Sequence, residues 1–259
     1  MESKNILETE KVGKLLRMFA IPCVLSLIIQ SLYNLVDQIY IGHCESLGAI
    51  GNAATGIVYP LTVIALGMGL WLGDGCAASM SLNQGKNNVK DTNKSVGTAL
   101  FFGSIVSILL MIFCFLFKKG ILSSIGASGK ILDFSMEYAN FIIAGFFFFC
   151  LACVLNPIIR ADGSPKYAMA AMAIGAVINI ALDPIFIFAI PMGMTGAALA
   201  TFLGQTITFL LHVGYLFKTK TFRLKVKSFI PQVKQIKLIL QLGICLLYTS
   251  PSPRDPKTS

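Results

Sequence analysis

Two aspartates lie inside long apolar runs, where an unpaired carboxylate is energetically unfavourable. Asp37 ends a polar series in which Ser26, Gln30, Tyr33 and Asn34 precede it at spacings of mostly three and four residues. In a helix this spacing places the side chains on one face. A charged Asp near the bilayer centre costs about 2.5–3.5 kcal/mol on insertion scales, so it normally faces a cavity or a partner. The alternative is that Asp37 is merely hydrated near the outer surface.

The second aspartate stands in the run Asn179-Ile-Ala-Leu-Asp183-Pro184. Asn179 and Asp183 are one helical turn apart, and Pro184 lacks a backbone N–H and should kink the helix. A kink frees a backbone carbonyl, and amide, carboxylate and carbonyl oxygens together suit a small cation. The same carboxyl group, partly desolvated, could instead carry a proton. The alternative is a polar pair that only holds the helices together.

The apolar run at 195–217 carries a polar face beside a face of small residues. The polar face holds Thr201, Gln205 and Thr208. The small residues recur every four positions, at Gly196, Ala200 and Gly204. Small residues allow two membrane helices to approach closely, so this run is expected to pack tightly on a neighbour.

Enzyme chemistry is not visible in the sequence. It contains no Ser/His/Asp set, no glycine-rich phosphate loop and no metal cluster. Cys150 and Cys153 form a CxxC, but no second pair completes a metal site, and they are interpreted as two small residues on one helix face. We therefore expect no enzyme activity, no cofactor and no metal beyond a possible sodium ion at the aspartates.

Long apolar segments must position these residues. The chain is 55% hydrophobic and only 13% charged, with a mean hydropathy of +0.75, whereas soluble domains carry about twice that charge fraction. Runs of about 20 residues with almost no charge are typical of transmembrane helices. The predicted fold is an all-α integral membrane bundle with six spans at 15–41, 51–82, 95–117, 134–159, 167–190 and 195–217.

The charges favour a membrane topology over nucleic-acid binding. The net charge is +9, but the basic residues stand in short clusters between apolar runs. They concentrate at the N-terminus and at 86–94, 160–166 and 218–237, while the alternate loops hold only Lys118, Lys119 and Lys130. By the positive-inside rule, the chain is expected to be a multi-pass protein of the cytoplasmic membrane with a cytoplasmic N-terminus.

Four regions are expected along the chain. Residues 1–217 form a six-helix lobe, 218–237 a basic cytoplasmic linker, and 238–244 the start of a seventh helix. Residues 245–259 are expected to be a non-native tail, because a Leu-rich helix turns abruptly into Ser/Pro-rich sequence and Cys245 to Asp255 looks like a translated sequencing adapter.

Four sequence patterns, in order, resemble the multidrug and toxic compound extrusion (MATE) transporters over about Lys14 to Lys237. They are Pro22 with Gln30, Asn34, Asp37 and Gly42; the run from Asn156 to Tyr167 through Arg160, Gly163 and Lys166; Asn179 with Asp183-Pro184; and Gly196-Ala-Ala-Leu-Ala-Thr201. Members of this family have twelve helices in two six-helix lobes. They exchange extracellular protons or sodium ions for cationic or amphipathic organic compounds.

The resemblance assigns roles to individual residues. It implies a cation and proton site formed by Asp37, Asn179, Asp183 and Thr201. Tyr138 and Asn156 match positions that line the same cavity, and the polar faces described above add Gln30, Asn34 and Gln205. The expected partners are the lipid bilayer, small cationic or amphipathic substrates, and a C-terminal lobe that this chain lacks.

Two other functions are alternatives to the export of cations. A lipid-linked oligosaccharide flippase of the same superfamily is expected to place cationic residues in its cavity, whereas the spans here carry carboxylates and almost no Lys or Arg. A non-transporting membrane scaffold is expected to have few intramembrane polar residues, all of them dispensable. A channel is disfavoured because no filter-like loop or ring of charges is present.

Overall fold

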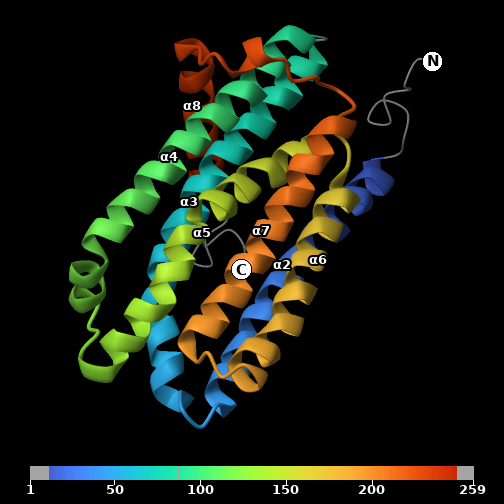
Figure 1. Cartoon of the computed structure of the whole chain (residues 1–259). Helices are drawn as coiled ribbons and strands as arrows, with labels where there is room; N and C mark the ends of the chain where they lie inside the picture. Colours follow the sequence, from blue (N-terminus) through green and yellow to red (C-terminus); the bar gives the residue numbers. More distant parts are fainter. Residues whose placement is uncertain (1–11, 87, 250–259) are drawn as a thin grey trace.

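The computed structural model describes residues 12–86 and 88–249, which form a bundle of long helices (Figure 1). Among these residues, six helical segments are long and apolar enough to cross a membrane. They are α2 (Val12–His43), α3 (Gly48–Gly85), α4 (Val89–Ser124), α5 (Gly129–Ala161), α6 (Pro165–Pro184) continued by η1 (Ile185–Ala189), and α7 (Met194–Tyr215). Each predicted span corresponds to one of them, so the all-α membrane fold is confirmed.

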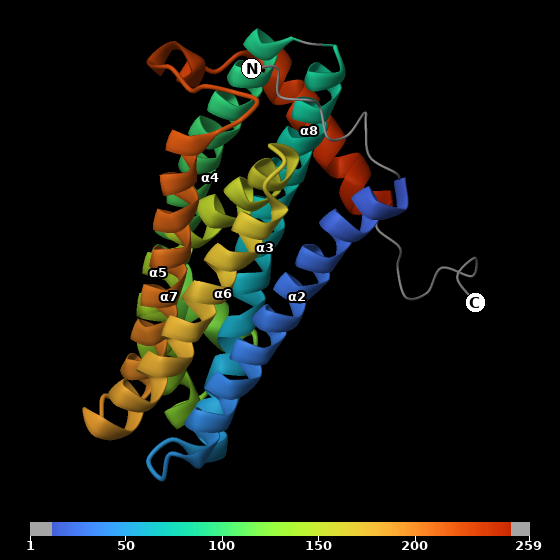
Figure 2. The same cartoon turned by 90° about the vertical axis from the view of Figure 1, so that its right-hand side faces the viewer.

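The helix α5 forms the centre of the bundle. It packs on α3, α4 and α7, and α2 packs mainly on α6. In the most apolar window of α5, 72% of the residues are buried, against 11% in α2. Figure 2 shows α2 tilted across the bundle, diverging from α6 and α7 toward its first residues. A polar site inside the bundle is therefore expected between the inner face of α2 and the helices α5, α6 and α7.

Small residues bring α6 and α7 into backbone contact. A Cβ added to Gly175 would lie 1.9 Å from Thr208 Oγ1 and 2.7 Å from the carbonyl of Gly204. A Cβ on Gly196 would lie 2.7 Å from the carbonyl of Phe186. The expected tight packing of the small-residue face is confirmed, and it fixes the register between the two helices.

The break expected at Pro184 takes the form of a π-helix. The α-helix ends at Pro184, and Ile185–Ala189 continues in π geometry, with the N–H of Ile190 donating to the carbonyl of Ile185 at 2.9 Å. Such π segments within helices recur at functional sites. Here the change of register follows directly after Asp183.

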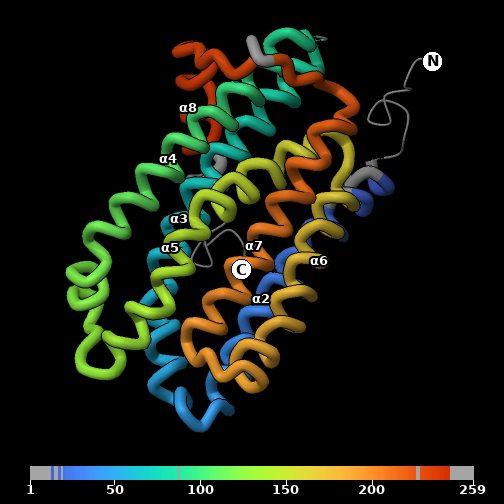
Figure 3. Tube along the Cα trace, in the orientation of Figure 1, coloured from blue at the N-terminus to red at the C-terminus, as the bar shows by residue number. Residues whose placement is uncertain are grey.

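The connections between the helices lie at the two ends of the bundle (Figure 3), and the sequence gives these ends different numbers of basic residues. We call the end that holds the α3–α4 and α5–α6 connections and residues 216–232 the basic end. It includes the short helices η2 (Leu216–Lys218) and η3 (Val226–Phe229). The opposite end holds Lys118, Lys119 and Lys130. Of the N-terminal basic residues, Lys4 and Lys11 lie outside the described residues.

A seventh helix, α8 (Val233–Thr249), packs against α3. Trp71 Nε1 donates to the carbonyl of Leu240 at 3.1 Å, and Ser95 Oγ donates to Gln235 Oε1 at 2.9 Å. The helix begins at Val233 rather than 238, because Gln232 accepts the first amide bonds of the turn. It runs through Thr249, and residues 250–259 of the expected tail lie outside the described residues.

Candidate cation and substrate site

The two intramembrane aspartates are buried on neighbouring helices. Asp37 on α2 is 6% exposed and Asp183 on α6 is fully buried, and the charge of Asp37 is close enough to act on Asp183. Asp37 Oδ1 and Asp183 Oδ2 have no hydrogen-bond partner within the described chain. Buried carboxylates are normally paired, so these two oxygens are unusual in lacking a partner among the described residues.

Asn179 links Asp183 to the next helix. Its Nδ2 donates to Asp183 Oδ1 and to Thr201 Oγ1, both at 3.4 Å, while its Oδ1 has no partner among the described residues. Tyr138 of α5 is buried beside Thr201 and faces both carboxyl groups. The structure thus brings the four predicted cation-site residues together, although their role remains a prediction.

A cavity of about 400 Å³, here called the outer cavity, opens beside Asp37. The predicted lining residues Gln30, Asn34, Tyr138 and Gln205 contribute to its wall, as does Thr201. Asp37 is the one charged side chain among the described residues that line it. Asp183 is not among the described residues that line this cavity, and Asn179 links it to Thr201, which does line it. The outer cavity therefore presents oxygen atoms and a single negative charge.

A second cavity of about 190 Å³, the inner cavity, continues toward the basic end of the bundle. Asn156 lines it, together with Asn179 and His212. The residues common to both cavities are Gln30, Tyr33, Leu66, Phe149, Thr201 and Gln205. The two cavities thus form consecutive compartments inside the bundle, and Thr201 and Gln205 stand at their junction.

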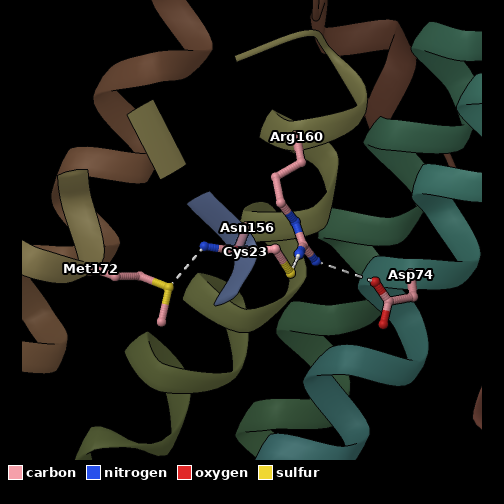
Figure 4. Close-up of polar contacts among 5 residues, drawn as sticks. All are labelled: Cys23, Asp74, Asn156, Arg160 and Met172. Carbon is pink, nitrogen blue, oxygen red and sulfur yellow. Dashed lines mark hydrogen bonds and ion pairs between the residues drawn. The ribbon is translucent and has the colours of Figure 1, made fainter. Parts of the chain in front are cut away.

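Arg160 lines the inner cavity near the basic end, and Figure 4 shows its contacts with Cys23 and Asp74. Its Nη1 donates to Cys23 Sγ of α2 at 2.9 Å, and its Nη2 lies 3.7 Å from Asp74 Oδ1 of α3. Nearby, Asn156 Nδ2 contacts Met172 Sδ of α6 at 3.1 Å. The positive charge of Arg160 is therefore offset by Asp74 rather than left free for a ligand.

Sequence reasoning missed the roles of two buried residues at the basic end. Asp162 is 1% exposed and accepts hydrogen bonds from Tyr215 Oη (2.7 Å), the backbone N–H of Lys220 and Thr221 (both 2.8 Å) and Thr221 Oγ1. His212 lines the inner cavity with neither ring nitrogen bonded within the described chain. Asp162 lies inside the run from Asn156 to Tyr167, but its partners are far away in sequence.

Comparisons with known proteins agree with this architecture. The profile of the MatE family matches residues 22–185. Over 241 residues the chain is 27% identical to "Probable multidrug resistance protein YoeA" of Bacillus subtilis, covering 90% of this chain and 52% of that protein. It is also 27% identical over 241 residues to "Multidrug export protein MepA" of Staphylococcus aureus (strain MSSA476), covering 92% and 52%.

A solved structure shows the same fold. The crystal structure of MATE in complex with MaD3S matches with a TM-score of 0.85 at 28% identity, over 92% of this chain and 54% of that one. The chain spans about half the length of the curated relatives it matches, as expected for an N-terminal lobe. Because the family profile matches more than half of its residues, this multi-pass membrane protein belongs to the MatE family of transporters, which are not enzymes.

Proposed function

We propose that this chain is the N-terminal lobe of a cation-coupled antiporter that exports cationic or amphipathic organic compounds across the cytoplasmic membrane. The coupling ion is a proton or sodium, bound by Asp37, Asn179, Asp183 and Thr201. The substrate occupies the cavities lined by Gln30, Asn34, Tyr138, Asn156 and Gln205, and a C-terminal lobe completes the pathway.

The observation that carries this proposal is the set of buried oxygens without partners. Asp37 Oδ1, Asn179 Oδ1 and Asp183 Oδ2 all lack hydrogen bonds in the described part of the chain. A sodium ion takes such hard oxygen ligands, and a proton takes a carboxylate. Two carboxylates within electrostatic reach repel each other when both are ionised, so adding one cation relieves this repulsion.

Coupling follows from the position of this cation beside the substrate cavity. Asp37 lines the outer cavity, and Thr201 lines both cavities. A bound proton or sodium ion removes the negative charge that holds a cationic substrate, and it favours whichever arrangement of α2 against α6 binds it more tightly. A ligand shifts such an equilibrium only by its difference in affinity between the two states.

The flippase alternative needs positive charge to receive a pyrophosphate group. No Lys or Arg is among the described residues that line the outer cavity. Arg160 in the inner cavity is paired with Asp74. This charge arrangement favours cationic substrates over anionic lipid-linked ones.

The proposal is tested by Asp37→Asn and Asp183→Asn in the full-length gene, measured by ethidium export from cells. Each substitution keeps the side-chain shape but removes the titratable charge, so export should fall to the background of cells without the transporter. Asp133→Asn is the matched control, because Asp133 is exposed at the start of α5. Export at the wild-type rate by both buried variants, at equal membrane levels, would overturn the proposal.

A further inference from the structure

A polar stripe runs along α7 from the cation site toward the basic end. Thr201, Gln205, Thr208 and His212 are spaced by four, three and four residues, which places them on one helix face, and all four line the inner cavity. At 1.5 Å per residue the stripe is about 16 Å long. It begins at the hydrogen bond from Asn179 to Thr201 and ends at a histidine.

The ring of His212 makes no hydrogen bond to the described residues. It is 1% exposed, and neither ring nitrogen has a partner among the described residues. The carbonyls of Ala152 on α5 and Ala168 on α6 flank the ring without reaching hydrogen-bond geometry. A neutral imidazole carries one N–H and a protonated one carries two, so two flanking carbonyls match the protonated ring. Burial opposes the charge, which suits a group that holds a proton only transiently.

The surroundings of His212 offer no permanent counter-charge. The titratable or charged groups that line the inner cavity from other helices are Cys23 and Tyr33 of α2 and Cys153 and Arg160 of α5. The described lining residues of α6 are uncharged, and Arg160 is paired with Asp74 of α3. One turn beyond His212, Tyr215 donates to Asp162. No described carboxylate lines this cavity, so none stabilises the protonated imidazole. The ring can therefore release the proton again.

We propose that His212 is a second proton-binding group of the transporter, placed between the aspartates and the cytoplasm. A proton leaves the carboxyl group of Asp37 or Asp183, which becomes a carboxylate. It passes along Thr201, Gln205, Thr208 and water in the inner cavity and forms the second N–H bond of the imidazole. That bond then breaks as the proton passes to water at the basic end. This inference rests on the proposed antiport and requires the proton as coupling ion.

The test uses the full-length transporter in liposomes with ethidium as substrate. His212→Gln should reduce proton-gradient-driven ethidium transport by about a hundredfold, the lower end of what a positioned proton-transfer group contributes. Ethidium–ethidium exchange at equal pH needs no net proton movement, so it should slow by a much smaller factor than gradient-driven transport. His43→Gln is the matched control, because His43 is exposed at the last residue of α2, away from the basic end.

A second pair of variants keeps the test decisive if His212→Gln fails to fold. Thr208→Val interrupts the stripe and should also slow gradient-driven transport by a larger factor than exchange. Thr206→Val should slow neither, since the Thr206 hydroxyl makes the same type of bond to its own helix but lines neither cavity.

Three results would overturn the inference: wild-type gradient-driven transport by His212→Gln, loss of exchange together with gradient-driven transport in a folded variant, or transport driven by sodium alone. Each of them can occur while Asp37→Asn and Asp183→Asn still abolish export. Failure of the inference is therefore distinguishable from failure of the proposed function, which would instead show as export by the aspartate variants.

Discussion

Three buried aspartates of this chain differ in how their oxygens are satisfied. Each carboxylate oxygen of Asp162 accepts two hydrogen bonds from the chain. This carboxylate therefore has a structural role. Asp37 and Asp183 each keep one oxygen without a partner in the described chain. Unsatisfied buried oxygens are costly and rare, so hydrogen-bond satisfaction separates an anchoring carboxylate from carboxylates available for ion binding.

The first prediction concerns the Asp162 anchor. Asp162→Asn replaces one accepting oxygen by an NH₂ group, which leaves at least one buried donor facing another donor. The expected loss is about 1–3 kcal/mol of stability, seen as a lower melting temperature of the purified full-length protein. Proteolysis within 216–232 should also become faster. An unchanged melting temperature, equal to that of Asp133→Asn, would contradict the anchoring role.

The sequence alone could identify some of these residues and not others. Asp37 and Asp183 are visible because a carboxylate in an apolar run is conspicuous without knowledge of its neighbours. Asp162 is not, because its partner Tyr215 lies 53 residues away. His212 stands near the end of an apolar run, and its importance depends on a cavity that only the packed helices form.

At the scale of helices, the α6–α7 contact positions the proposed cation site. Gly204 approaches the carbonyl of Gly175 so closely that a Cβ would lie 2.8 Å from it, and 3.1 Å from the Cβ of Asn179. Asn179 can reach Thr201 across the interface only because the helices are this close. The glycines are therefore as much a part of the site as its polar residues.

The second prediction is that Gly175→Ala impairs export although it removes no polar group. The new methyl would meet Thr208 Oγ1 at 1.9 Å and the Gly204 carbonyl at 2.7 Å, and backbone cannot move aside without separating the helices. Such overpacking typically costs about 1–3 kcal/mol. Ethidium export should fall with it, whereas Gly214→Ala, where nothing lies near the added Cβ, should retain it. Equal export by both variants would show that the close approach is dispensable.

Hydropathy located every span but not the helix ends. The span predicted at 95–117 corresponds to α4, which runs from Val89 to Ser124. At 1.5 Å per residue this helix is about 54 Å long, well beyond the roughly 30 Å hydrocarbon core. Its extra turns contain Lys118 and Lys119, where the helix continues although the membrane core has ended. Apolar patterning reports burial in lipid, and helix ends depend on local capping such as Asn88 at the start of α4.

At the scale of the whole molecule, charge divides the bundle into two unequal ends. The described basic residues of the basic end include Lys86, Lys90, Lys94, Lys166, Lys218, Lys220 and Arg223. The opposite end holds Lys118, Lys119 and Lys130. From the positive-inside rule we propose that the basic end lies in the cytoplasm.

The third prediction tests this orientation with reporter fusions. A green fluorescent protein joined after Ile230 should be fluorescent, and one joined after Ala127 should not, because this reporter folds only on the cytoplasmic side. Alkaline phosphatase at the same two positions should give the reverse result. Fluorescence at Ala127 with phosphatase activity at Ile230 would invert the topology and the direction of export.

The chain spans about half the length of its relatives, so every transport experiment has to use the full-length protein. Helix α2 leaves apolar side chains uncovered, with Leu27, Leu32 and Leu35 each more than half exposed. We therefore propose that residues 218–232 are a linker and that α8, from Val233, is the start of the next helix. We also propose that the native gene carries a second lobe in place of the tail from 245 onward. Sequencing the source DNA past the codon for Ile244 decides this directly.

The central claim, cation-coupled export, is tested most directly by reconstituting the full-length protein in liposomes. Ethidium movement would be followed after imposing a proton gradient, a sodium gradient, both or neither. The account predicts net ethidium movement opposite to the flow of one imposed cation, no net movement without a gradient, and none with Asp37→Asn. Transport that proceeds equally with no gradient, or that neither proton nor sodium gradients drive, would contradict it.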